Sequence, residues 1–142
     1  MKTQVVQNSI ILHDGKILIL RRSPTSRRRP LQWGLVGGFL ENNEELIAGI
    51  VREVFEESGM KVSNPNPVFA KTELRSWIED DTKNQENVIY IFYLVKSETA
   101  EVVLSSEHVE FKWMTLEEAL NELEYPLHKE VLQYILDNQL ID

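Results

Sequence analysis

Three acidic residues in one segment have the spacing of neighbours on a helix. Glu53, Glu56 and Glu57 are separated by three and four positions, and residues at these separations lie side by side on a helical surface. Unpaired carboxylates there repel one another and destabilise the helix by roughly a few tenths of a kcal/mol per pair. A divalent cation reverses this effect, and Mg²⁺ characteristically joins carboxylate oxygens to substrate phosphates. The spacing therefore indicates a carboxylate site for a hard cation.

The residues around these glutamates predict a helix from about 44 to 58. Asn42 and Asn43 are suitable caps at its start, and Gly59 is a suitable left-handed stop at its end. At about 100° per residue, the apolar residues fall on one arc: Leu46, Ile47, Ile50, Val51, Val54 and Phe55. We expect this arc to pack on the core. The acidic stripe, formed by Glu53, Glu56 and Glu57, should lie beside it. A glutamate-rich helix face is usually solvated surface, so the spacing alone does not decide the function.

The order of the residues around the helix does distinguish the segment. Gly38 is followed after five residues by Glu44, and after seven more by the run Arg52–Met60, REVFEESGM. This order resembles the Nudix box at every defining position: Gly, five free, Glu, seven free, Arg-Glu, aliphatic, one free, Glu-Glu, one free, Gly, aliphatic. The sequence differs from many family members at two positions: Val36 stands where proline is frequent, and Asn43 stands where glycine is frequent. Neither residue is an expected metal ligand.

The resemblance implies a metal site with defined ligands. Glu53, Glu56 and Glu57 would bind Mg²⁺, with Mn²⁺ as a substitute, and the carbonyl of Gly37 or Gly38 would add a ligand. A bound cation of this kind polarises a phosphoryl oxygen and lowers the pKa of a bound water, which attacks phosphorus. The implied reaction is hydrolysis of a diphosphate linkage.

The resemblance also implies supporting catalytic residues. Arg52 and Glu44 would be orienting partners that join the loop to the helix. The general base differs among family members; Glu53 is the first choice, and Glu107, before the last predicted strand, is the second.

Basic and aromatic residues are candidates for substrate binding. Arg21 or Arg22 ends a predicted strand that leads towards the box and could hold a phosphate, although an exposed charge pair is an equal alternative. The run Arg27–Arg29 is either a phosphate-capturing loop or a solubilising one. Trp33 could stack on a base or anchor the loop, and Trp77 is the candidate for a lid in the polar loop 76–87.

The remaining chain predicts an α/β domain. The apolar runs 10–12 and 17–20 flank an Asp-Gly turn and predict a hairpin covered on both faces. Further strands are expected near 68–75, 88–95 and 109–114. A capping box at Thr115 starts a short helix, and an apolar stripe at 127–140 predicts a terminal one. Together with the resemblance, this implies the Nudix fold, an α/β/α sandwich with a mixed central β-sheet.

Length, charge and composition limit the function. The 142 residues are expected to form one domain, 1–142, without a substrate-specific second domain. The chain has no cysteine, no apolar run near the roughly 20 residues that cross a bilayer and no signal-peptide pattern, so we expect a cytoplasmic protein without membrane partners. Residues 1–36 carry seven Lys/Arg and one acid, a net +6, whereas the rest carries eight Lys/Arg and 22 acids, a net −14. Such an acidic body disfavours duplex nucleic acid as a partner.

The expected function is Mg²⁺-dependent hydrolysis of a small-molecule nucleoside diphosphate-X substrate. A nucleoside-triphosphate pyrophosphohydrolase of the MutT type is favoured, because the sequence lacks the long N-terminal dimerisation extension often associated with ADP-ribose hydrolases. A homodimer is a further hypothesis. ADP-ribose, dinucleoside polyphosphates, nucleotide sugars and capped RNA are alternative substrates. Isopentenyl-diphosphate isomerase chemistry is disfavoured by the lack of cysteine. A catalytically inactive Nudix domain that senses a nucleotide is the alternative from a non-enzymatic class. A protein that binds partners through its acidic surface is a third hypothesis.

Overall fold

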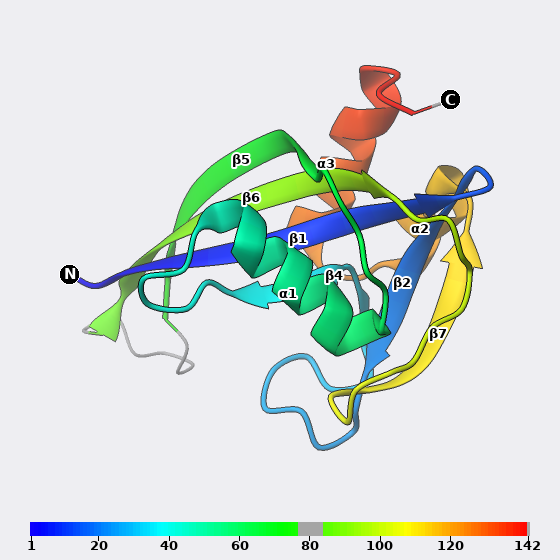
Figure 1. Cartoon of the computed structure of the whole chain (residues 1–142). Helices are drawn as coiled ribbons and strands as arrows, with labels where there is room; N and C mark the ends of the chain where they lie inside the picture. Colours follow the sequence, from blue (N-terminus) through cyan, green and yellow to red (C-terminus); the bar gives the residue numbers. More distant parts are fainter. Residues whose placement is uncertain (77–83, 142) are drawn as a thin grey trace.

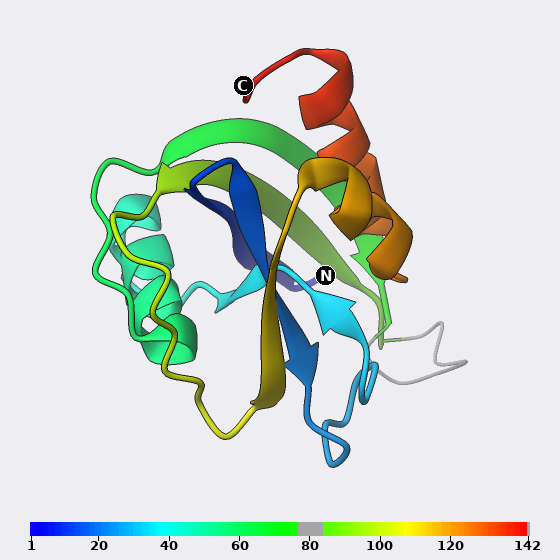
Figure 2. The ribbon, with the colours of Figure 1, turned by 90° about the vertical axis from the view of Figure 1, so that its right-hand side faces the viewer.

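A mixed β-sheet runs through the middle of the protein, with one helix on one face and two on the other (Figure 1, Figure 2). The computed structural model describes residues 1–76 and 84–141. Within these residues, no helix is long and apolar enough to cross a membrane. The elements are β1 (Thr3–His13), β2 (Lys16–Arg22), β3 (Trp33–Gly34), β4 (Val36–Phe39), α1 (Leu46–Ser58), β5 (Asn66–Arg75), β6 (Glu86–Lys96), β7 (His108–Met114), α2 (Leu116–Glu122) and α3 (Pro126–Asp137).

Strand β1 is the centre of the sheet. The path through the described residues is β3-β2-β1-β6-β5, with β4 also pairing with β1 and β7 with β2. β1 runs parallel to β6 and antiparallel to β2 and β4. In the β1–β4 register Asn8 is opposite Gly37, so the glycine pair that precedes the helix lies directly on the central strand.

Two hydrophobic clusters cover the two faces of the sheet. In β1, Ile10 packs with α2 and α3 whereas Ile11 packs with α1; in β2, Ile17 and Leu18 divide in the same way. All four side chains are fully buried. Successive residues of a strand point to opposite faces, so the consecutive apolar runs reflect a sheet covered on both sides, as predicted.

The ends of the helices follow local sequence rules in part. Gly59 adopts φ 74° after α1, and its N–H donates to the carbonyl of Phe55. Thr115 and Glu118 form the predicted capping box of α2. The predicted start of α1 was two residues early. Asn43 adopts φ 62° in the preceding turn, so Glu45 becomes the extended N-cap residue and makes no side-chain cap hydrogen bond.

The face of α1 that packs on the sheet differs from the predicted one. The predicted apolar arc is only partly buried: Leu46, Ile47 and Phe55 are 43%, 47% and 50% exposed. The buried edge instead consists of Gly49, Ile50, Val54, Glu57 and Ser58. The acidic stripe is therefore turned further towards the sheet than the helical wheel predicts, because the two glycines of β4 leave room for carboxylates there.

Candidate active site

A cavity of about 1330 Å³ brings acidic and basic residues to one place. Its acidic wall comes from the loop after β4, from α1 and from the loop before β7: Glu41, Glu53, Glu56, Glu57 and Glu107. Its basic wall comes from β2, the loop that follows it and the end of β5: Arg22, Arg27, Arg28, Arg29 and Arg75. Opposite charges at one cavity suit a ligand that combines bound cations with phosphate groups.

Glu57 is the most deeply buried carboxylate of the acidic wall. Its side chain is 7% exposed, and its Oε1 accepts a hydrogen bond of 2.8 Å from the backbone N–H of Gly37. Its Oε2 lies 3.8 Å from Nδ1 of His108, a ring whose own pKa is lowered to about 4, mainly by burial. Burial raises the pKa of Glu57 to about 8 despite the Gly37 hydrogen bond, and the nearby charges of Glu53 and Glu107 contribute to the rise. Among the described residues, no Lys or Arg forms an ion pair with this carboxylate.

Glu53 lies one helical turn earlier and packs against the backbone of β4. A Cβ built on Gly38 would stand 2.6 Å from both of its carboxylate oxygens. Burial raises the pKa of Glu53, and the neighbouring Arg52 opposes that rise. The sequence needs glycine at position 38 because only a residue without a side chain leaves this space for the carboxylate.

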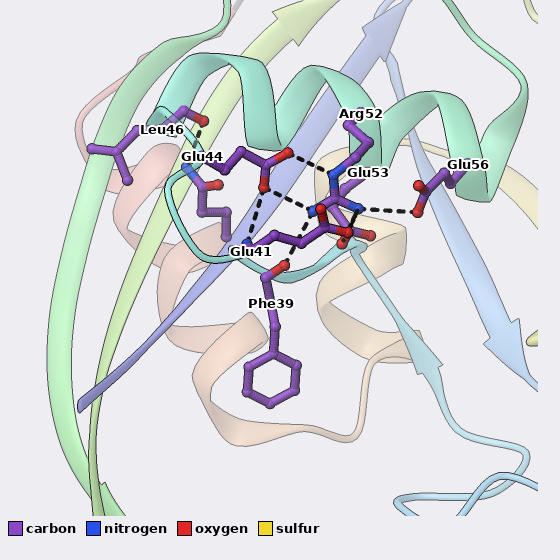
Figure 3. A network of polar contacts seen from close by, with 8 residues as sticks. Phe39, Glu41, Glu44, Leu46, Arg52, Glu53 and Glu56 are labelled. Atoms are coloured by element: carbon purple, nitrogen blue, oxygen red, sulfur yellow. Dashed lines mark hydrogen bonds and ion pairs between the residues drawn. The ribbon is translucent and has the colours of Figure 1, made fainter. Parts of the chain in front are cut away.

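Arg52 connects the loop to the helix through a network of polar contacts (Figure 3). Its guanidinium donates to both carboxylate oxygens of Glu44, from Nε at 2.7 Å and from Nη2 at 3.0 Å. Nη2 also donates to the carbonyl of Phe39, and Nη1 donates to Glu53 and Glu56 at 3.0 and 3.1 Å. The hydrogen bond from Arg52 is the main cause that lowers the pKa of Glu44 to about 2. The Arg52 guanidinium thus donates hydrogen bonds to three carboxylates and joins the loop that carries Glu44 to the helix that carries Glu53 and Glu56.

The carboxylates suit a hard divalent cation by their chemistry. In the part of the chain that the structure describes, no three acidic or histidine side chains already surround a common point. Each carboxylate instead turns to a local donor: Glu53 and Glu56 to Arg52, and Glu57 to the Gly37 N–H. The donors are all oxygens, and the buried, mutually repelling charges of Glu53 and Glu57 would be offset by a cation. The residues present therefore fit Mg²⁺.

Some of the predicted site residues line the cavity, and others lie outside its lining. Glu107 and Arg22 line the cavity. Arg21 is not part of the lining; its guanidinium pairs with Glu110 at 2.9 Å. Trp33 is 7% exposed in the core cluster of α2 and α3, which favours the anchoring role over base stacking. Trp77 lies outside the described residues.

Several lining residues were missed by the sequence analysis. They meet at the basic end of the cavity and come from the last residue of β5 (Arg75), the middle of β6 (Tyr90), the N-cap of α3 (Tyr125) and the first turn of α3 (His128). No local motif marks them, because they are neighbours only through the packing of distant elements. Burial lowers the pKa of His128 to about 3, so this ring is neutral.

Comparisons with known proteins agree with the site. The family model described as the NUDIX domain matches residues 3–135. The nucleoside triphosphatase NudI of Enterobacter sp. strain 638 is 27% identical over 127 residues, which cover 87% of this chain and 89% of the relative. NudI of Escherichia fergusonii is 26% identical over 117 residues, which cover 80% and 83% of the two chains. The crystal structure of a MutT protein from Methanosarcina mazei Go1 superposes with a TM-score of 0.75 at 28% identity, covering 99% of this chain and 97% of that one.

The chain belongs to the NUDIX family. It has the α/β fold of the solved MutT structures, with a mixed sheet between helices. It is accordingly a Nudix-type hydrolase that acts on phosphorus-containing anhydrides.

Proposed function

We propose that this protein is a Mg²⁺-dependent nucleoside-triphosphate pyrophosphohydrolase of the MutT type. The observation that carries the proposal is the burial of the Glu53 and Glu57 carboxylates against Gly38 and Gly37, in a cavity whose other wall is basic. The names of the NudI relatives support triphosphates as the substrate class. The large charge difference between the two walls supports a polyphosphate lying across the cavity.

The residues that would hold the cation are Glu53, Glu56 and Glu57, with a carbonyl of Gly37 or Gly38 as a further ligand. When bound to these residues, a cation would supply polarisation of a phosphoryl oxygen and a more acidic bound water. Arg52 holds Glu53 and Glu56 on the cavity side of α1, so it acts as a positioning residue. Mn²⁺ has the same preference for oxygen ligands and would substitute.

Proton removal from the attacking water is assigned to a carboxylate of the acidic wall. Glu53 is the first candidate, because burial raises its pKa towards the range in which a carboxylate accepts a proton efficiently. Glu107 is the second candidate, since it lines the same cavity from the loop before β7. Arg22, also in the lining, would bind a substrate phosphate.

The decisive experiment incubates the protein and Mg²⁺ with a nucleotide panel and identifies the products, which locates the scissile bond. The panel includes nucleoside triphosphates, ADP-ribose, dinucleoside polyphosphates and nucleotide sugars. We expect nucleoside triphosphates to be hydrolysed to a monophosphate and pyrophosphate. Preferred cleavage of another compound would replace the substrate assignment, and binding without cleavage would indicate a nucleotide-sensing module.

The residue assignment is tested with Glu53→Gln and Glu56→Gln, each made separately. We expect each to lower the rate at least about 100-fold while the protein still folds. Glu45→Gln is the matched control, because Glu45 is an exposed residue at the start of the same helix, outside the cavity lining. Full activity of both site variants on a verified substrate would contradict the assignment.

The cytoplasmic location and the homodimer stay predictions.

A further inference from the structure

Two arginines converge on one tyrosine at the basic end of the cavity. The guanidinium of Arg29 lies 3.9 Å from the ring centroid of Tyr125, and that of Arg75 lies 5.3 Å from the same ring. Arg75 also donates to the hydroxyl of Tyr125 and, at 3.1 Å, to the hydroxyl of Tyr90. Three distant segments are thereby joined: the β2–β3 loop, the end of β5 and the start of α3.

Arg29 is the cation of this group that no described residue neutralises through an ion pair. Within the described residues its side chain makes no ion pair and no hydrogen bond, and its contact is the stack on Tyr125. Arg75, in contrast, pairs with Glu73 at 3.1 Å. The Arg29 side chain is half-buried, and this burial lowers the pKa of its guanidinium. A partly desolvated cation without a counter-ion is costly, and a bound anion would offset that cost.

The backbone at Arg29 adds to that cost. Arg29 adopts φ 45°, a left-handed conformation that side chains disfavour. Such strain persists where the surrounding structure holds it, and it concentrates at ligand-binding sites. The stack on Tyr125 holds the guanidinium at the cavity wall.

The cavity has room for a ligand group beyond the one at the glutamates. Its volume of about 1330 Å³ exceeds the roughly 300–1,000 Å³ of ordinary ligand pockets. One face of the Arg29 guanidinium is already covered by the Tyr125 ring, which leaves its N–H groups as the recognition element. Guanidinium N–H groups match the oxygens of phosphate.

We propose that Arg29, Arg75 and Tyr125 form a second anion subsite, which binds a phosphate group of the substrate that lies outside the scissile diphosphate. The proposal rests on the proposed function in one respect, namely that this cavity is the active site. For the proposed triphosphate substrate this group is the γ-phosphate, which lies outside the α–β linkage that is cut.

The first test measures binding of inorganic phosphate to the metal-free protein in excess chelator, by ³¹P NMR titration. Without a cation the glutamates repel phosphate, so binding reports on the arginines alone. We expect Arg29→Gln and Arg75→Gln each to weaken binding roughly tenfold. Lys129→Gln is the charge-matched control, because Lys129 is exposed on the first turn of α3 and outside the cavity lining. Unchanged binding in Arg29→Gln would overturn the proposal.

Arg29→Lys tests whether weaker phosphate binding in Arg29→Gln comes from the lost charge or from a change in the local structure. Lysine keeps the charge but lacks the planar fork, so we expect affinity between that of the wild type and that of Arg29→Gln. Circular dichroism and thermal unfolding verify that each variant folds. If Arg29→Lys and Arg29→Gln weaken phosphate binding equally while both fold, the charge is not what binds phosphate, and the proposal falls.

The second test separates a substrate phosphate from free phosphate. Calorimetric binding of a nucleoside diphosphate and of the corresponding nucleoside triphosphate is measured in a Glu53→Gln background with Mg²⁺, where neither compound is consumed. We expect roughly tenfold tighter binding of the triphosphate, and loss of that preference when Arg29→Gln is added. Equal affinities would overturn the subsite as a substrate site. A preserved preference in a protein that hydrolyses nothing would refute the proposed function and leave the subsite standing.

Discussion

The backbone of Gly38 lies in contact with the carboxylate of Glu53, and the backbone N–H of the preceding Gly37 donates to Glu57. Two successive glycines of β4 thus lie against two carboxylates that are one helical turn apart on α1. The pairing of β4 with β1 fixes the position of the glycines, so the sheet determines where the acidic edge of the helix lies.

A methyl group at Gly38 is expected to displace Glu53 without unfolding the protein. The added Cβ would stand 2.6 Å from the end of a flexible side chain, which can move away at low cost. Gly38→Ala should therefore lower kcat by roughly tenfold or more, because misplacement of a reacting group by about 1 Å costs up to about 100-fold. Urea unfolding and a rate assay check this, and full activity of Gly38→Ala would contradict it.

Gly37→Ala is the contrasting variant. Its Cβ would stand 2.0 Å from the carbonyl oxygen of Gln7 and 2.7 Å from the Cα of Asn8. Backbone cannot move aside as a side chain does, so we expect a loss of about 1–3 kcal/mol or more in the free energy of unfolding. A Gly37→Ala protein as stable as the wild type would show that β4 is less closely held on β1 than the structure indicates.

Replacement of Arg52 should weaken metal-dependent activity through the carboxylates that it orients. Arg52→Lys loses the two-pronged contact with Glu44 and the contacts with Glu53 and Glu56. We expect the Mg²⁺ concentration for half-maximal rate to rise roughly 10–100-fold, as is usual for residues behind metal ligands. A double-mutant cycle with Glu44→Gln should be non-additive, whereas one with Glu45→Gln should be additive.

The stability of the metal-free protein should fall as the pH rises from 6.5 to 8. The folded pKa of Glu57 is about 8, against an ordinary value of 4.5, so the folded state binds the extra proton between these values and loses that advantage as the pH approaches 8. His108 and His128 have folded pKa values lowered to about 4 and 3 from the ordinary value of 6.5, so their deprotonation in the unfolded state adds slightly to stability just above pH 6.5. This contribution is common to the wild type and Glu57→Gln, so the difference between the two proteins reports on Glu57.

Urea unfolding in chelator measures this dependence. We expect the wild type to lose about 1–2 kcal/mol relative to Glu57→Gln over the interval. Saturating Mg²⁺ should reduce the loss, because a cation binds the deprotonated carboxylate. Parallel pH curves for the two proteins would show that Glu57 is not buried in its protonated form.

Two isoleucines of α1 test which face of the helix packs on the sheet. Ile50 is fully buried and Ile47 is 47% exposed. Ile50→Ala should lower the free energy of unfolding by about 2–5 kcal/mol, and Ile47→Ala by less than about 1 kcal/mol. Equal losses would support the wider apolar arc that the sequence predicts.

Local sequence rules account for much of the fold and for the acidic half of the site. The Asp14-Gly15 hairpin, the Thr115 capping box and the Gly59 stop form as predicted, because each depends on residues within a few positions of one another. The order of residues from Gly38 to Met60 identified the family, and the family model confirms it. The sequence by itself therefore determined the class of enzyme and the carboxylates proposed to serve it.

Only the tertiary structure decided how α1 is rotated and what lies opposite it. Periodicity ranks the faces of a helix by polarity, but the face that packs depends on the partner surface. Here the glycines of β4 admit Glu53 and Glu57 and leave Ile47 and Phe55 partly exposed. Arg29, Arg75 and Tyr125 meet because the β2–β3 loop, β5 and α3 close on one cavity. Contacts between such distant segments arise from the packing of the whole sheet, which no short stretch of sequence encodes.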